Sequence, residues 1–202
     1  MVGAKSRRNP YRFDGAAATL QSLMRTLHSP HCTLEPQVVA HADEMFVVLC
    51  DPAIYEFEGV PPPSLERLAD GFARRQSRRS PDGSQQWLNW VVRLPTGELT
   101  GYVQATLLAS GASYVGYEFA SRFWRQGLGT AAISTMLDEL ASAYAVNTFV
   151  AVLKTGNYRS MGLLTRLGFE PATAEQAALY EFELDETVLL KPARPDASVT
   201  AP

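Results

Sequence analysis

The sequence is poor in cysteine and has no long hydrophobic run. Its two cysteines, Cys32 and Cys50, form no CxxC pair, and His28 and His31 beside Cys32 lack a fourth ligand for zinc. We therefore expect a reduced chain in the cytoplasm that binds no metal. No stretch of about 18 apolar residues is present, and the N-terminus lacks the apolar core of a signal peptide, so neither a membrane span nor export is expected.

The chain also has little net charge. Its 202 residues include 21 acidic and 18 basic side chains, a net charge of −3, which argues against general nucleic-acid binding. A chain of this length is expected to form one domain that folds without disulfides or a structural metal. Only Lys5, Lys154 and Lys191 among the basic residues are lysines. The others are arginines, which bind phosphate through paired hydrogen bonds, so an arginine beside an anion site would be informative.

The two ends of the chain differ from its middle. Residues 1–25 show no sustained periodicity, and the tail KPARPDASVTAP holds three prolines. We expect flexible extensions at 1–25 and 189–202 around a single domain at 26–188.

The hydrophobic pattern of this domain predicts a mixed order of helices and strands. Turn residues at 95–97 and at Gly111 join three strands into an antiparallel meander. This order of helices and strands predicts an α+β layered fold. Its central sheet is mixed and mostly antiparallel, is flanked by helices and contains one strand–helix–strand crossover. The expected strands are 32–36, 87–94, 99–108, 113–119, 147–153 and 178–184, and the expected helices are 37–50, 64–79, about five turns from Gly127, and 157–167.

The strongest functional signal is the segment SRFWRQGLGTAAISTML, where a loop enters the long helix. Gly127 and Gly129 let backbone N–H groups approach a ligand closely, and the helix N-terminus adds a partial positive charge. This arrangement predicts a pyrophosphate site, with Arg122 and Arg125 as phosphate partners.

The same glycines can be compared with two other nucleotide-binding patterns. The letters GLGTAA satisfy G-x-G-x-x-A, a form of the dinucleotide fingerprint of Rossmann oxidoreductases. That fingerprint needs a buried strand running into Gly127 and an acidic residue where this chain has Lys154, so the context does not fit. The phosphate loop of nucleoside triphosphatases also fails, because no lysine follows the glycines.

Because the antiparallel meander precedes the glycine loop, the sequence resembles the GNAT family of N-acetyltransferases. Residues 114–132 are similar to the family motif that grips the pyrophosphate of acetyl-coenzyme A, with Trp124 in the first position of R/Q-x-x-G-x-G/A. That tryptophan resembles the branch of ribosomal-protein N-terminal acetyltransferases, as do Asp51-Pro52-Ala53-Ile54, Asn157-x-x-Ser160 and Leu167-Gly168-Phe169. The resemblance covers about Cys32 to Leu184. It implies the GNAT fold and an acetyl transferase.

The resemblance also implies which residues hold the cofactor. The backbone of the glycine loop would bind the pyrophosphate, the end of the preceding strand would pair with the pantetheine amides and leave an N–H for the oxyanion, and an asparagine would contact the cofactor arm. The cofactor-binding residues expected on this basis are Phe119, Ala120, Arg122, Arg125, Gln126, Gly127, Leu128, Gly129, Thr130 and Asn157.

Acid–base chemistry is expected from two side chains. An amine of pKa about 8 to 10 is largely protonated at neutral pH, so a carboxylate that accepts its proton helps. Glu118 is the first candidate, against the alternative that it faces solvent or pairs with an arginine. Many family members use a tyrosine as general acid where this chain has Leu164. By resemblance Ser160 would replace it, with a helix-cap role as the alternative and Tyr158 as a weaker candidate.

The acceptor side is expected around Tyr55, Glu56 and Glu58, since the equivalent region forms the acceptor wall in relatives; these acids could equally be ordinary loop residues. Their charge hints at a cationic acceptor. The resemblance thus predicts an N-acetyltransferase in which an amine, of a protein N-terminus or a small molecule, attacks acetyl-coenzyme A directly. The alternative is a non-catalytic acyl-coenzyme A sensor or scaffold. The expected partners are acetyl-coenzyme A and the amine, without nucleic acid or membrane, and the sequence is compatible with a homodimer.

Overall fold

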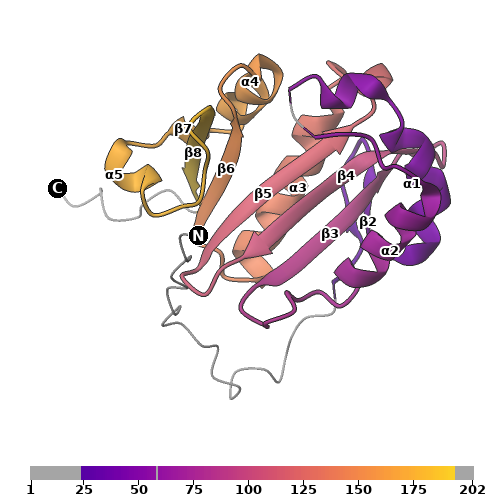
Figure 1. Cartoon of the computed structure of the whole chain (residues 1–202), viewed down its shortest axis with the longest axis horizontal. Coiled ribbons are helices and arrows are strands. Elements are labelled where there is room, and N and C mark those ends of the chain that lie inside the picture. The colour runs from indigo at the N-terminus through magenta and orange to yellow at the C-terminus, as the bar shows by residue number, and fades with distance from the viewer. Residues whose placement is uncertain (1–23, 58, 194–202) are drawn as a thin grey trace, which may run out of the picture.

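The computed structural model describes residues 24–57 and 59–193 (Figure 1). Most of the extension expected at 1–25, Glu58 of the expected acceptor wall, and residues 194–202 of the expected tail lie outside the described residues. Arg25 is an exception, and the structure corrects its assignment. Its side chain pairs with the buried Glu139 at 2.5 Å and its carbonyl accepts a hydrogen bond from Trp90 Nε1, so Arg25 belongs to the domain.

One sheet runs through the whole described chain. Its strands lie in the order β1-β2-β3-β4-β5-β6-β8-β7, and every neighbouring pair is antiparallel except β5 and β6, which are parallel. This confirms the expected mixed, mostly antiparallel sheet with one crossover. The strands are β1 (Leu27–His28), β2 (Thr33–Pro36), β3 (Gln86–Arg93), β4 (Leu99–Leu107), β5 (Ala112–Phe119), β6 (Thr148–Lys154), β7 (Glu170–Pro171) and β8 (Glu186–Pro192).

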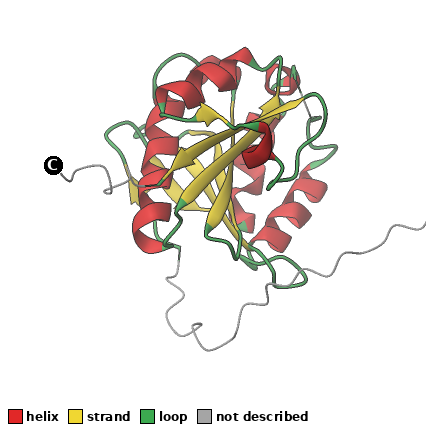
Figure 2. Ribbon diagram, turned by 90° about the vertical axis from the view of Figure 1, so that its left-hand side faces the viewer, coloured by secondary structure: helices red, strands yellow, loops and turns green. Residues whose placement is uncertain are grey.

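Helices cover both faces of the sheet (Figure 2). Side chains alternate along β3, so that Trp90 and Val92 join the core beneath α3, while Val91 joins the core beneath α1 and α2. The helices are α1 (Ala42–Leu49), α2 (Leu65–Arg75), α3 (Leu128–Ala143), α4 (Tyr158–Arg166) and α5 (Ala174–Ala177), with short 3-10 helices η2 (Val39–His41), η3 (Pro52–Tyr55) and η4 (Ser121–Phe123).

The sequence placed the last strand wrongly. Residues 178–184 form no strand, and Leu179, Phe182 and Leu184 are exposed. The strand is β8, whose Val188 and Leu189 are buried between β6 and β7. The expected domain boundary at 188 therefore falls inside β8, so residues 189–192 belong to the sheet and not to a tail.

Two helices also begin or end elsewhere than expected. The helix expected at 64–79 ends at Arg75, and Arg78 has φ of +61°, a left-handed conformation that a helix cannot continue. The first helix starts as the 3-10 turn η2 before α1. The helix expected at 157–167 is confirmed as α4, and Gly168 has the left-handed φ of +82° that is typical of a helix stop.

The strands β5 and β6 pair over only part of their length. Their register runs from Ala112 opposite Thr148 to Tyr114 opposite Val150, after which the rest of β6 pairs only with β8. The second half of β5, from Val115 to Phe119, therefore has an edge without a strand neighbour on the side of α4. This opening between two parallel strands, at their carboxyl ends, positions the functional site.

Candidate active site

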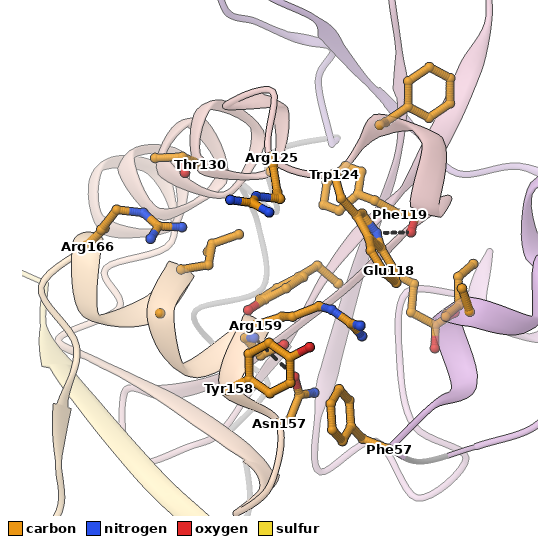
Figure 3. A pocket seen from close by; sticks show the side chains of 18 of the residues that line it. Phe57, Glu118, Phe119, Trp124, Arg125, Thr130, Asn157, Tyr158, Arg159 and Arg166 are labelled. Atoms are coloured by element: carbon orange, nitrogen blue, oxygen red, sulfur yellow. Dashed lines mark hydrogen bonds between the residues drawn. The ribbon is translucent and has the colours of Figure 1, made fainter.

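A cleft of about 960 Å³ lies where β5 and β6 separate (Figure 3). The end of β5 contributes its floor, and η3 with Phe57 forms one wall. The glycine loop before α3 and the first turns of α4 form the other. The side chains that line the cleft include Ile54, Phe57, Tyr117, Glu118, Phe119, Trp124, Arg125, Thr130, Asn157, Tyr158, Arg159, Ser160 and Arg166.

The glycine loop has the conformation that an anion site needs. Gly127 is the N-cap of α3 with φ of +78°, and no side chain caps this helix end. The first N–H groups of α3 thus have no partner within the helix. A Cβ on Gly129 would lie 3.0 Å from Leu163 Cδ1, so glycine allows α4 to pack close to the start of α3. Gly127, Gly129 and Thr130 all line the cleft.

The structure divides the predicted cofactor residues into two groups. Phe119, Arg125 and Asn157 line the cleft together with the glycine loop. The others do not line it: Ala120 and Leu128 are buried in the core, the Gln126 side chain donates to the Arg122 carbonyl, and Arg122 pairs with Glu98 at 2.6 Å.

The sequence analysis missed two arginines of the cleft, Arg159 and Arg166. Arg166 lies near the end of α4 and faces the cleft from the side opposite Arg125 (Figure 3). Its position depends on how α4 packs beside α3, which no motif in the sequence encodes. Arg125, Arg159 and Arg166 outnumber the one lining carboxylate, Glu118, so the cleft suits a phosphate-bearing ligand.

Glu118 lies in the cleft among tyrosines. It is opposite Tyr102 in the register of β4 and β5. Burial raises the pKa of Tyr102 well above its usual value, and the Glu118 carboxylate raises it further. Burial also raises the pKa of Tyr55, again with a contribution from Glu118. Tyr102 packs against the core beneath α1 and α2, and residues directly opposite each other on antiparallel strands share a face, so Glu118 lies on that side of the sheet.

Asn157, and not Ser160, caps α4. Asn157 Oδ1 accepts a hydrogen bond from the Ser160 backbone N–H at 3.1 Å. The hydroxyl of Ser160 is therefore not needed as a cap, and Ser160 lines the cleft. Leu164, at the position of the family's tyrosine, is buried in the core and carries no hydroxyl.

Tyr117 is a cleft residue that the sequence reasoning missed. It lies two positions before Phe119 on β5, on the same face, and its buried hydroxyl has no hydrogen-bond partner among the described residues. Burial raises the pKa of Tyr117 to about 12, although the nearby Ser160 acts in the opposite direction. The hydroxyl therefore stays protonated at neutral pH. The period of two along β5 could have indicated Tyr117 once Phe119 was assigned to the site.

The predicted acceptor residues are not all on the cleft. Tyr55 donates its hydroxyl to the Leu49 carbonyl at 2.9 Å and does not line the cleft. Glu56 forms an ion pair with Arg159. The wall itself consists of Ala53, Ile54 and Phe57.

Asp51 fixes this wall to the end of β5. Its Oδ2 accepts from the Ser121 N–H at 2.6 Å and its Oδ1 from the Ala53 N–H at 3.0 Å. Burial acts to raise the pKa of Asp51, but these hydrogen bonds outweigh it and lower the pKa below its usual value.

Comparison with known families gives a match over most of this structure. Residues 31–170 match the acetyltransferase (GNAT) domain, which includes every element that lines the cleft. The chain belongs to the GNAT acetyltransferase family. It is therefore an acetyl-coenzyme A-dependent N-acetyltransferase, as the glycine loop in its strand–helix context predicted.

Solved structures confirm the GNAT fold. RimL, a ribosomal L7/L12 α-N-protein acetyltransferase in complex with coenzyme A, has a TM-score of 0.69 at 15% identity, covering 83% of this chain and 98% of that one. The ribosomal-protein-S5-alanine acetyltransferase of Vibrio fischeri has a TM-score of 0.67 at 16% identity, covering 84% and 97%. A GNAT acetyltransferase of Bacillus anthracis has a TM-score of 0.66 at 11% identity, covering 84% and 99%. No curated protein matches the sequence.

Two features are absent from the described residues of this GNAT chain, 24–57 and 59–193. No group of three or more histidine, cysteine or acidic side chains is placed to hold a metal ion. Over the same residues, no helix is long and apolar enough to cross a membrane.

Proposed function

We propose that this GNAT enzyme transfers the acetyl group by direct attack of a primary amine on the thioester of acetyl-coenzyme A, with Glu118 as general base. The observation that carries the proposal is the meeting, in one cleft, of an uncapped helix N-terminus, a strand with an open edge, and a carboxylate. These features correspond to the three parts of the reaction, which are binding the cofactor phosphates, aligning the thioester, and deprotonating the amine.

The cofactor would lie along the open edge of β5. The N–H groups at the start of α3 and the guanidinium groups of Arg125 and Arg166 suit its phosphates. Backbone groups of Val115 to Phe119 suit its amide-containing arm, because an extended chain can pair with an unpartnered strand edge. Arg122 points to Glu98 instead, so Arg166 replaces it in the proposed set.

Glu118 would accept the proton of the attacking amine from the acceptor side. The departing thiolate needs a proton or a hydrogen bond from the other side of β5, where Ser160 and Tyr117 lie. Ser160 is the donor that the family resemblance implies. The Tyr117 hydroxyl supports the same role, because it is protonated and its hydrogen-bonding capacity is unused among the described residues.

A pair of glycine substitutions tests the phosphate site. Gly127→Ala and Gly97→Ala both place a Cβ on a residue with positive φ, +78° and +93°, in open space. The backbone strain is therefore alike, about 1 kcal/mol in each. Only Gly127 lies in the cleft, so we expect weaker acetyl-coenzyme A binding by calorimetry in Gly127→Ala alone. Equal binding by the two variants would contradict the site.

The reaction itself is tested by thiol release from acetyl-coenzyme A with a panel of amines, including peptides with free N-termini, polyamines, amino acids and aminoglycosides. Release that depends on one amine class would identify the acceptor. Tight cofactor binding without amine-dependent release would favour a sensor or scaffold, an alternative for which the cleft offers no specific support.

A further inference from the structure

Arg159 crosses the mouth of the cleft and contacts groups from both walls (Figure 3). Its Nη1 donates to Glu56 Oε2 at 2.5 Å. Its guanidinium lies 4.7 Å from the ring centre of Trp124, 5.5 Å from that of Phe57 and 5.2 Å from that of Tyr158. A cation over an aromatic face is attracted by the ring quadrupole, so one side chain makes four favourable contacts.

These contacts join segments that are far apart in the sequence. Glu56 and Phe57 follow η3 in the acceptor wall, Trp124 precedes the glycine loop, and Arg159 and Tyr158 begin α4. The Phe57 and Tyr158 rings also meet edge to face at 5.8 Å. Trp124 is itself fixed, because its Nε1 donates to the Phe119 carbonyl at 2.7 Å. The Arg159 cluster (Glu56, Phe57, Trp124, Tyr158 and Arg159) therefore connects the acceptor wall to the cofactor wall.

The acceptor wall is held at its other end by Asp51, whose carboxylate binds the Ser121 and Ala53 N–H groups. The wall residues Ala53 and Ile54 lie between these two attachments. The Tyr55 hydroxyl also donates to the Leu49 carbonyl at 2.9 Å. Glu56 and Phe57, at the end of the wall, come after this bond and contact the opposite side of the cleft through Arg159 and Tyr158. The Arg159 cluster thus completes the attachment of the acceptor wall.

We propose that Arg159 is a positioning residue, which holds the acceptor wall at a fixed distance from the cofactor wall so that the bound amine faces Glu118. This inference rests on the proposed function and adds a residue that the glycine-loop motif does not indicate. It also changes the role assigned to Glu56. The charge of Glu56 is taken up by Arg159, so Glu56 serves the wall and does not bind a cationic acceptor directly.

Kinetics separates this role from cofactor binding. Arg159→Ala removes one half-exposed ion pair and three cation–π contacts, so we expect the acceptor KM to rise about tenfold. The Kd for acetyl-coenzyme A should stay within about twofold of wild type. Glu56→Gln should raise the acceptor KM less, and the double variant should be no worse than Arg159→Ala, because the two residues act through one contact. Arg159→Lys keeps the charge and should recover part of the loss.

Glu98→Gln is the matched control. Glu98 also pairs with an arginine, Arg122, at 2.6 Å, and its side chain is 48% exposed against 45% for Glu56, but it lies outside the cleft. Its acceptor KM should equal that of wild type. An unchanged acceptor KM in Arg159→Ala, or an equal loss of cofactor and acceptor affinity, would overturn the positioning role.

Hydrogen–deuterium exchange tests the cluster without any turnover. Amides of residues 51–57 should exchange faster in Arg159→Ala than in wild type or Glu98→Gln. If the wild-type protein acetylates no amine, the proposed function is wrong, but the exchange rates still test whether the Arg159 cluster holds residues 51–57 in place. Unchanged exchange in Arg159→Ala would refute the inference even in an active enzyme.

Discussion

Gly101 offers a sharp test of the packing that positions Glu118. It lies on β4 opposite Phe119, and a Cβ there would be 2.0 Å from the Glu118 carbonyl oxygen and 2.8 Å from Phe119 Cα. A carbon and an oxygen atom come into contact at about 3.3 Å, so β5 would have to move by about 1.3 Å. Both neighbours are backbone and cannot rotate away. We therefore expect Gly101→Ala to cost about 3 kcal/mol of unfolding free energy, at the upper end for an overpacked site.

The matched control is Gly116→Ala on the facing strand. There a Cβ would meet the Gln104 amide nitrogen at 2.9 Å, but that side chain can swing aside. Its stability should stay within about 1 kcal/mol of wild type. Thermal unfolding should show a melting temperature about 6 to 12 °C lower for Gly101→Ala, since a chain of this size loses about 2 to 4 °C per kcal/mol. Its kcat/KM should fall as well, because Glu118 and Phe119 move. Equal melting temperatures for the two variants would refute the argument.

Three further predictions concern the cleft. Glu118→Gln should lower kcat/KM at least a hundredfold and remove the acidic limb of the pH–rate profile, and an unchanged profile would exclude it as base. Tyr117→Phe should lower kcat about tenfold without loss of stability, because the buried hydroxyl that it removes has no hydrogen-bond partner among the described residues; an unaltered kcat would exclude Tyr117 as the donor. Asp51 has a lowered pKa when folded, so its stabilisation is present above its unfolded pKa and is lost as the pH falls through the folded pKa. Urea unfolding should therefore find Asp51→Asn less stable than wild type at pH 7, with a difference that shrinks as the pH falls below about 4. A difference that stays constant with pH would contradict this.

Local signals in the sequence predicted most of the fold. The turn at 95–97 and Gly111 fixed the meander, and the change of period after Gly127 located the helix that crosses to β6. The glycine loop located the cleft, because positive φ and a bare helix start are properties of a few adjacent residues. Such features are readable from sequence since they need no distant partner.

The incorrect predictions concern residues whose structure depends on contacts with residues distant in the sequence. Residues 180–184 alternate apolar and acidic side chains, which is a strand pattern, but the buried strand residues are Val188 and Leu189, which lie between β6 and β7. The approach of Arg166 to the cleft depends on how helices pack, and the pairing of Glu56 with Arg159 joins residues about a hundred positions apart. No local pattern carries that information.

The open edge of β5 has a consequence for solubility. An unpaired strand edge on the outside of a protein invites strands of other molecules and promotes aggregation. In this enzyme the free edge borders the cleft, which Tyr117, Glu118 and Phe119 line together with residues of α4. A slender amide-containing arm fits there more readily. The enzyme can thus keep a reactive strand edge for its ligand without exposing that edge to its neighbours in solution.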